Sequence, residues 1–344
     1  MSDQNNQAPG QPGIPARWTS SAKTGVGTSL NPSSRVWFSL SHGIFDEIYY
    51  PRVDQACTRD MGMIVTDGKD FFSEEKRDAE HEVAYLQPGV PAYKLTNNCS
   101  QGRYQIEKKI LSDPARDVIY QETRFKALKG KLSDYHLHVL LSPHLGNQGA
   151  DNSAWTGDYK GVPMLFAEHG ADALALACSL PWKGRSVGYV GESDGWQDLN
   201  EHKQMSWFYR SAPNGNVALL GEIDLSGAKG TEASFTLVLG FGRNASEAGQ
   251  RALASLLDGF DTARDEYLKE WQNWQEEFPD IQIEGYKPGK VNVYEISRAV
   301  MRTHEAKRFP GGLIASLSIP WGFSKGDDDL GGYHLILLCA IWSK

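Results

Sequence analysis

Apolar and polar residues alternate in short runs from about Trp18 to Phe241, and Gly, Pro, Asn or Asp interrupts them every ten residues or so. Two of the runs show the two-residue period of a β-strand directly: Val118, Tyr120, Glu122 and Arg124, and Tyr135, Leu137, Val139 and Leu141. Successive side chains of a strand point to opposite faces, so each run should line one face of a sheet. The pattern predicts a mainly β domain made of two large stacked antiparallel sheets rather than one small barrel.

The period becomes helical after Gly242. Residues 246–257 place apolar residues on one side of a helix: Ala248, Ala252, Leu253 and Leu256. A second helix is expected to follow with Asp261 as its cap, because Asp commonly caps helix N-termini. Its apolar residues recur at helical spacing: Tyr267, Leu268, Trp271, Trp274 and Phe278. We interpret this aromatic stripe as a seam that packs on the sandwich or on the next domain, with a sugar-binding platform as the alternative.

Gly and Pro residues then mark a linker from Phe278 to Gly289, and a helical pattern restarts from Val291 to Arg308. The sequence therefore predicts three parts. Residues 1–17 form a flexible N-terminal segment, residues 18–278 form a β-sandwich domain that ends in linker helices, and residues 279–344 form a linker and the first elements of a helical domain.

Composition narrows the possible partners. The chain has 344 residues, 40% of them hydrophobic, which is enough for a large core. Its formal net charge of -8 and the lack of a basic cluster argue against nucleic-acid and anionic-membrane partners. The N-terminus resembles no signal peptide, and no run of about 18 apolar residues is present. As written, the chain is expected to be soluble and cytoplasmic.

Cysteine and histidine positions predict no disulfide, metal or other cofactor. The four cysteines are widely separated and are interpreted as small buried hydrophobes: Cys57, Cys99, Cys178 and Cys339. His136 and His138 would share one face of a strand, but no carboxylate or cysteine stands nearby at ligand spacing. A polar strand face is the favoured interpretation of that histidine pair.

The stretch from His304 to Leu335 carries the candidate functional residues. A Pro-Gly turn and a short apolar run lead to Pro320-Trp321-Gly322, which would bring an aromatic side chain and a flexible loop to the rim of a pocket. Trp321 is therefore a candidate substrate-binding residue, with a core or interface role as the alternative for it and for Phe323. We interpret the acidic run at 327–329 as a solvated loop rather than a catalytic pair.

Seven blocks of sequence follow one another in a recognisable order: GVGTS at 25–29, SRVWFSLSHGIFDEIYYP at 34–51, Arg59-Asp60, VTDG at 65–68, GYVGESDGW at 188–196, LGFG at 239–242 and HEAKRFPGGLIASLSIPWG at 304–322. In these blocks the chain resembles glycoside hydrolase family 15, in its branch of bacterial glucodextranases and glucoamylases. The resemblance implies a supersandwich of the galactose-mutarotase type followed by an (α/α)6 barrel. It also implies an inverting, exo-acting enzyme that releases β-glucose from α-glucans.

An inverting hydrolase needs a carboxylic acid and a carboxylate roughly 6.5–9.5 Å apart. The family carries both glutamates deep in its barrel, past Lys344, so we predict no catalytic residue in this chain. In the family, Gly-Tyr-His precedes a Trp-x-Arg-Asp motif, and the Tyr and the Arg-Asp pair line the subsite for the terminal glucose. Tyr333 matches that tyrosine. Tyr333 and Trp321 are the predicted substrate-binding residues.

The sequence departs from the family after Leu335 or Ile336, and the Arg-Asp pair is missing. When residues 338–344 are written in suitable degenerate codons and the frame is shifted, they read Val-Arg-Asp-Leu-Val-Glu, which restores that pair. We therefore interpret the chain as a frameshifted, truncated hydrolase that is inactive alone. The segment from Val291 to Lys344 would lack its barrel neighbours, so we expect it to expose its apolar residues and to be poorly anchored.

Three functions remain open. The favoured one is the truncated α-glucan hydrolase. The second is a stand-alone carbohydrate-binding module, whose aromatic side chains would stack on sugars: Trp37, Tyr49, Tyr50 and Trp196. The third is a mutarotase or sugar-phosphate epimerase, with His42, Glu47 or His136 as acid and base.

Overall fold

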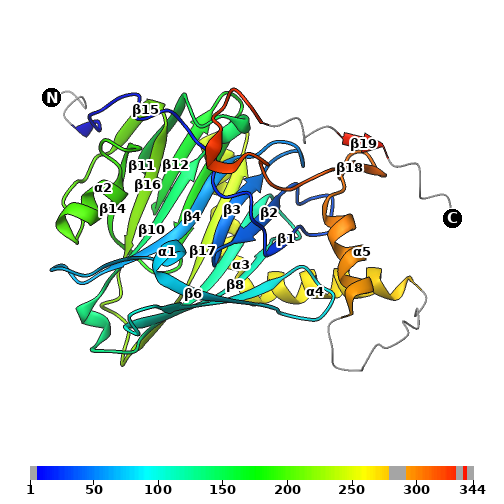
Figure 1. Cartoon of the computed structure of the whole chain (residues 1–344), viewed down its shortest axis with the longest axis horizontal. Helices are drawn as coiled ribbons and strands as arrows, with labels where there is room; N and C mark the ends of the chain where they lie inside the picture. Colours follow the sequence, from blue (N-terminus) through cyan, green and yellow to red (C-terminus); the bar gives the residue numbers. More distant parts are fainter. Residues whose placement is uncertain (1–5, 279–291, 331–335, 339–344) are drawn as a thin grey trace.

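Two antiparallel sheets stacked face to face form the body of the protein (Figure 1). The computed structural model describes residues 6–278, 292–330 and 336–338. The eight-stranded sheet has the order β1 (Gly25–Gly27), β2 (Trp37–Ser41), β3 (Ile44–Tyr49), β4 (Thr58–Thr66), β10 (His136–Pro143), β16 (Val217–Ile223) and β14 (Trp182–Tyr189), with β5 (Phe72–Glu74) paired to β4. The nine-stranded sheet has the order β15 (Ser211–Gly215), β11 (Asn152–Tyr159), β12 (Val162–His169), β13 (Asp172–Cys178), β17 (Glu232–Gly242), β9 (Val118–Ala127), β8 (Tyr104–Ser112), β7 (Tyr93–Cys99) and β6 (Ala79–Tyr85).

The predicted two-layer antiparallel sandwich is therefore confirmed, and the two-residue period is the reason for it. On β10, Leu137, Val139 and Leu141 point into the core between the sheets, while His138 points to the outer face. On β9, Ile119 and Phe125 enter that core, whereas Val118 and Tyr120 face outward under the helices. Both faces of the nine-stranded sheet are thus covered by apolar contacts.

Helices α3 (Ala245–Asp258) and α4 (Phe260–Glu276) cover the outer face of the nine-stranded sheet. The expected cap by Asp261 is wrong, because α4 begins directly after Gly259, whose φ of 82° gives the tight break between the helices. The aromatic stripe is confirmed as a packing seam. Tyr267 and Trp271 are fully buried, and both donate hydrogen bonds to the carbonyl oxygen of Thr28, at 2.8 and 3.0 Å.

The segment that follows residue 291 consists of α5 (Val293–Thr303), β18 (Gly312–Ile314), the 3-10 turn η4 (Gly322–Ser324) and β19 (Ile336–Leu338), which pairs with β18. The Asn292 side chain caps α5 by accepting from the amides of Tyr294 and Glu295. The helix predicted in this region is therefore present. Shorter helices lie elsewhere in the described residues, among them α1 (Glu75–Asp78), α2 (Gly195–His202), η2 (Leu132–Asp134) and η3 (Leu145–Asn147).

Residues 6–17, predicted to be part of a flexible segment, lie against the sandwich. The amides of Arg210 and Asn216 donate to the carbonyl oxygens of Asn6 and Pro12, at 2.8 and 2.9 Å, and Ala8 is buried. Cys57, Cys99 and Cys178 are buried free thiols, as predicted, while Cys339 lies outside the described residues. Within the described ranges, no helix combines the length and apolar character that crossing a membrane requires.

Candidate functional site

Trp321 lies in the loop after β18 and keeps part of its ring at the surface. The residue is 44% exposed, and its indole Nε1 donates to the Asp329 carboxylate at 3.0 Å. Phe323 beside it is 69% exposed. Tyr333, the other predicted substrate-binding residue, lies outside the described residues. The loop thus presents two aromatic rings to solvent, and the role of Trp321 at a pocket rim stays a prediction.

The segment that carries Trp321 is anchored to the sandwich by buried apolar side chains. Ile314, Leu317 and Ile319 are at most 2% exposed. They pack in one cluster with Trp18, Trp37 and Tyr49 of the sandwich, and with Val26, Val53, Ala56 and Ala306. The expectation of a poorly anchored segment is therefore wrong for this part, because the edge of the sandwich provides the apolar neighbours that the barrel was expected to provide. Val300, Trp321 and Phe323 do remain exposed.

Glu47 on β3 binds the backbone of the segment that carries Trp321. Its Oε1 accepts from the Ile319 amide at 3.3 Å, and its Oε2 accepts from the Ser39 hydroxyl at 3.1 Å. The side chain is fully buried. Burial, followed by the neighbouring Asp46 carboxylate, raises the pKa of Glu47 to about 8. A protonated Glu47 under the segment satisfies the amide without placing a bare charge in the cluster.

Further polar contacts fix the loop that follows Ile319. The Asp327 carboxylate accepts from the amides of Gly149 and Ala150, at 2.8 and 2.9 Å, and Arg17 donates to the carbonyl oxygen of Ser324 at 3.2 Å. The acidic run at 327–329 is thus engaged through Asp327 and Asp329, whereas Asp328 is exposed. Asp327 is therefore held against the sandwich, whereas Asp328 and Asp329 keep much of their surface in solvent, as expected for a solvated loop.

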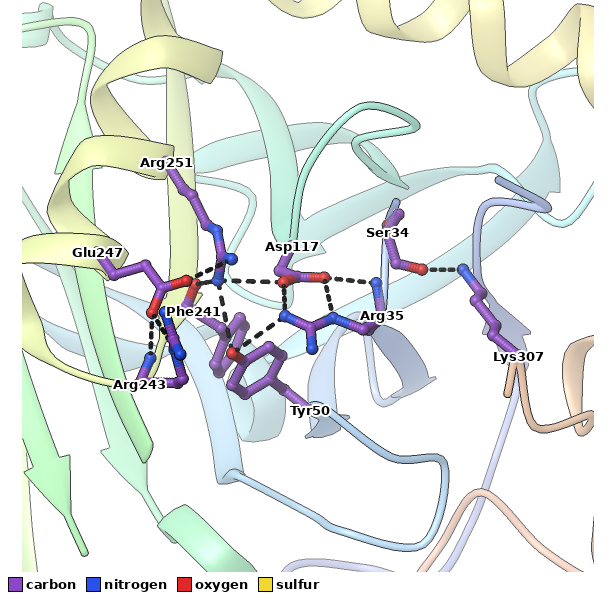
Figure 2. Close-up of polar contacts among 9 residues, drawn as sticks. All are labelled: Ser34, Arg35, Tyr50, Asp117, Phe241, Arg243, Glu247, Arg251 and Lys307. Carbon is purple, nitrogen blue, oxygen red and sulfur yellow. Dashed lines mark hydrogen bonds and ion pairs between the residues drawn. The ribbon is translucent and has the colours of Figure 1, made fainter. Parts of the chain in front are cut away.

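Lys307, which follows α5, is a further polar anchor of the segment. Its ammonium group donates to the carbonyl oxygen of Ser34 (Figure 2). It also donates to the carbonyl oxygen of Asn31 and lies 5.2 Å from the centre of the Trp37 ring. Burial lowers the pKa of Lys307 to about 7. Carbonyl dipoles and an aromatic face are the partners that a partly desolvated ammonium needs when no carboxylate contacts it directly.

A charged network holds the backbone next to Ser34, whose carbonyl oxygen accepts from Lys307. Asp117, immediately before β9, is nearly fully buried and lies between two guanidinium groups, those of Arg35 and Arg251 (Figure 2). The ion-pair distances are 2.6 Å to Arg35 and 3.0 Å to Arg251. Arg251 also donates to Glu247 at 2.6 Å on α3. The network therefore ties the loop before β2 to α3 and fixes the position of Ser34 for Lys307.

The titration of Glu47 gives a testable pH dependence. Its pKa is about 8 in the folded chain, against an ordinary value of 4.5, so the folded chain binds more protons between these values. Glu47 therefore stabilises the fold most below pH 4.5, and this contribution is lost as the pH rises to 8. We expect the stability of the wild type relative to Glu47→Gln to fall by on the order of 1 kcal/mol per pH unit in this window.

Urea unfolding at several pH values measures this difference. Glu82→Gln serves as the matched control, because Glu82 is an exposed glutamate on β6. Its difference from the wild type should stay flat with pH. A flat curve for Glu47→Gln as well would mean that Glu47 is ionised beneath Ile319.

The aromatic residues proposed for a carbohydrate-binding module do not form a sugar-binding surface. Trp37, Tyr49 and Tyr50 are at most 1% exposed, and Trp196 donates to Glu74 at 3.0 Å and packs on Phe72. The residues proposed as acid and base of a mutarotase do not contact one another either. Glu47 is buried under Ile319, His42 contacts Ser41, and His136 contacts Glu222. Among the described residues, no group of three His, Cys, Asp or Glu side chains has the arrangement of a metal site.

Of three cavities in the described part of the chain, two contain carboxylates. One cavity, of about 320 Å³, contains Glu222 and Asp224, whose pKa values are both lowered. A second, of about 220 Å³, contains Glu305, which accepts from Arg302 and from the Gly311 amide. The third, of about 590 Å³, lies between β1 and α5 and has no carboxylate in its lining. Asp46 and Glu47, whose pKa values are raised to about 7 and 8, line none of the three.

Three anchors of the segment were not predicted from the sequence: Glu47, Lys307 and Asp327. One signal for the docking was present. The run from Leu313 to Ile319 is too apolar for an exposed loop, and it therefore required a partner surface. No local signal pointed to Lys307 or Asp327 as an anchor, because their partners lie far away in the sequence.

Known proteins share this architecture and much of this sequence. The family model for domain N of glucodextranase matches residues 8–276. A glucoamylase from Clostridium sp. (strain G0005) is 37% identical over 341 residues, which is 99% of this chain and 46% of that protein. The crystal structure of a bacterial glucoamylase complexed with acarbose has a TM-score of 0.90 and 38% identity, over 96% of this chain and 48% of that one. This chain therefore spans about half the length of these relatives.

Proposed function

Because this chain belongs to the glucodextranase domain N family, in the bacterial glucodextranase and glucoamylase branch of glycoside hydrolase family 15, we propose that it supplies the supporting half of an α-glucan hydrolase. In this proposal the complete enzyme is an inverting exo-acting α-glucosidase that releases β-glucose from the ends of α-glucans. The sandwich holds the segment that leads into the catalytic half. This chain itself performs no turnover.

The observation that carries the proposal is the burial of Ile314, Leu317 and Ile319 against Trp18, Trp37 and Tyr49. Fully burying an aliphatic side chain contributes about 1.5–3 kcal/mol, so three of them provide a substantial docking energy before entropy is subtracted. Glu47, Lys307 and Asp327 add directional contacts to three separate points of the same segment. The sandwich therefore fixes the position of the loop that carries Trp321.

The carboxylates of the described residues support the second part of the proposal. Inverting hydrolysis needs one protonated carboxyl group at the leaving oxygen and one carboxylate that activates water. The carboxyl groups with the most strongly raised pKa values, Asp46 and Glu47, lie buried in the sheet. Glu222, which does line a cavity, has a pKa of about 2 and cannot donate a proton at neutral pH. These residues therefore provide no acid and base pair around a substrate.

A glucose-release assay tests the proposal. Purified chain incubated with maltotetraose should release no glucose above a buffer control, while the Clostridium glucoamylase assayed in parallel should release it. Uncatalysed hydrolysis of a glycosidic bond is extremely slow, so the assay has almost no background. Sustained release by this chain that Glu47→Gln or Asp46→Asn abolishes would overturn the proposal, because it would identify a working acid within the sandwich.

A further inference from the structure

A cavity of about 320 Å³ opens on the sandwich itself, and the segment from 292 to 330 takes no part in it. The strands that line it are β10, β14 and β16, which lie on the opposite side of the molecule from α5 in Figure 1. The 3-10 turn η2 and the loop after β16 form its other walls. Its apolar lining consists of Leu132, Ile223, Leu225 and Ala228. The volume is at the lower end of the range for small-molecule sites.

One wall of the cavity is a three-residue polar cluster. Glu222 Oε1 accepts from His136 Nδ1 at 2.6 Å and from Lys183 Nζ at 2.8 Å. Burial alone would raise the pKa of Glu222, but these two hydrogen bonds outweigh it and lower the pKa to about 2. Glu222 is therefore a carboxylate at any ordinary pH. Its second oxygen, Oε2, accepts no hydrogen bond from the described residues.

Strand register explains why these three side chains converge. His136 is near the start of β10, which runs antiparallel to β16, and Glu222 is next to the last residue of β16. The pairing of β14 with β16 shifts between Trp182 and Gly184, so Lys183 sits in a β-bulge opposite Glu222. A bulge redirects the side chain of the extra residue. Lys183 thereby contacts Glu222 and keeps 52% of its side chain exposed at the cavity mouth.

The charges of the lining select a neutral ligand. Lys131 and Lys183 balance Glu222 and Asp224, so neither an anion nor a cation is favoured overall. Two groups of the lining remain available to a ligand. Glu222 Oε2 can accept a hydrogen bond, and the partly exposed Lys183 ammonium next to it can donate one. Two adjacent hydroxyl groups match this pair, one donating to Glu222 and the other accepting from Lys183. The apolar floor suits the C–H face of a ring.

We propose that this cavity binds one neutral sugar ring through adjacent hydroxyl groups held by Glu222 and Lys183. The site is separate from the segment that carries Trp321, and it does not depend on the hydrolase assignment. His136 is a positioning residue, because its contact with Oε1 leaves Oε2 to face the ligand. His138 stacks beside His136 with ring centres 6.3 Å apart and, with a pKa lowered to about 4 by burial, stays neutral behind it.

Ligand-observed NMR titration with D-glucose tests the site on the full chain. The wild type should show saturable transfer of magnetisation to glucose, and Lys183→Met should weaken the apparent affinity about tenfold, as expected for the loss of a hydrogen bond from a charged donor. Lys109→Met is the matched control, since Lys109 is also partly exposed on a strand and pairs with Glu122 at 2.6 Å, outside the cavity. It should leave glucose binding unchanged.

A second variant and a second probe complete the test. Glu222→Gln should weaken glucose binding at least as much as Lys183→Met, and inorganic phosphate should not displace glucose. Equal binding by Lys183→Met and the wild type would place any glucose elsewhere and overturn the proposal. Absence of binding to the wild type, or displacement of glucose by phosphate, would overturn it as well. If Glu222→Gln does not fold, the half-exposed Lys183 variant decides the question.

Discussion

Lys108→Met is expected to lower the free energy of unfolding by about 3–5 kcal/mol, because it leaves a buried carboxylate without its counter-ion. Lys108 on β8 and Glu75 on α1 are both 0% exposed, and their charged groups are 2.5 Å apart. Glu75 Oε2 also accepts from the Met63 amide at 3.0 Å, and Lys108 donates to the Gly43 carbonyl oxygen at 3.2 Å. The pair thus links β8 of the nine-stranded sheet to the backbone of β4 in the eight-stranded sheet.

The next residue along the same strand provides the control. Lys109 pairs with Glu122 at 2.6 Å, but both side chains are partly exposed, so Lys109→Met should cost less than about 1 kcal/mol. The double variant Lys108→Met with Glu75→Gln should recover part of the loss, since no unpaired charge then remains in the core. Urea unfolding measures all three. Equal costs for Lys108→Met and Lys109→Met would show that the buried pair is not a special determinant of stability.

Trp18→Ala is expected to cost about 3–5 kcal/mol and to release the segment around Ile319 from the sandwich. Trp18 is fully buried, belongs to the cluster that contains Leu317 and Ile319, and lies edge-on to His144 with ring centres 4.6 Å apart. Its removal leaves a large cavity directly under the docked segment. Urea unfolding gives the cost, and limited proteolysis shows whether residues 312–330 become cleavable.

Trp321→Ala is the control for this substitution, because it removes a tryptophan of the same segment that is 44% exposed. Its cost should stay below about 1 kcal/mol, with no new cleavage sites. If Trp18→Ala lost stability while residues 312–330 stayed protected, the segment would be held by its polar anchors alone. The apolar cluster would then have no role in docking.

Local patterns predicted most of the fold. The alternation of apolar and polar residues in runs such as 135–141 follows from the geometry of a single strand, so it can be recognised without knowing the neighbouring strands. The helical spacing of Tyr267 and Trp271 likewise follows from the geometry of a single helix. The docking of Leu317 and Ile319 could not be predicted in this way. Their partners Trp18 and Trp37 are separated from them by most of the chain, and no local period encodes such a contact.

The other features that the sequence did not predict involve charged residues. Lys108 and Glu75 lie in the core against the usual rule that Lys and Glu stay exposed, and only their mutual contact makes this possible. Lys183 reaches Glu222 through a bulge, and a bulge shifts the register by one residue without a clear sequence signal. Trp321 is partly exposed, as its Pro-Trp-Gly turn suggested, but its place at a pocket rim stays a prediction. Tyr333 lies outside the described residues, so its role stays a prediction.

Hydrogen–deuterium exchange over residues 312–322 tests most directly whether the sandwich holds this segment in place. The Ile314 amide donates to the His304 carbonyl oxygen at 3.0 Å, and the Ile319 amide donates to the buried Glu47 carboxyl group at 3.3 Å. We predict that these amides exchange at least about a hundredfold more slowly than unprotected ones in the wild type, and lose that protection in Trp18→Ala. Exchange at the unprotected rate in the wild type would contradict the account, because the sandwich would then hold nothing in place for a catalytic half.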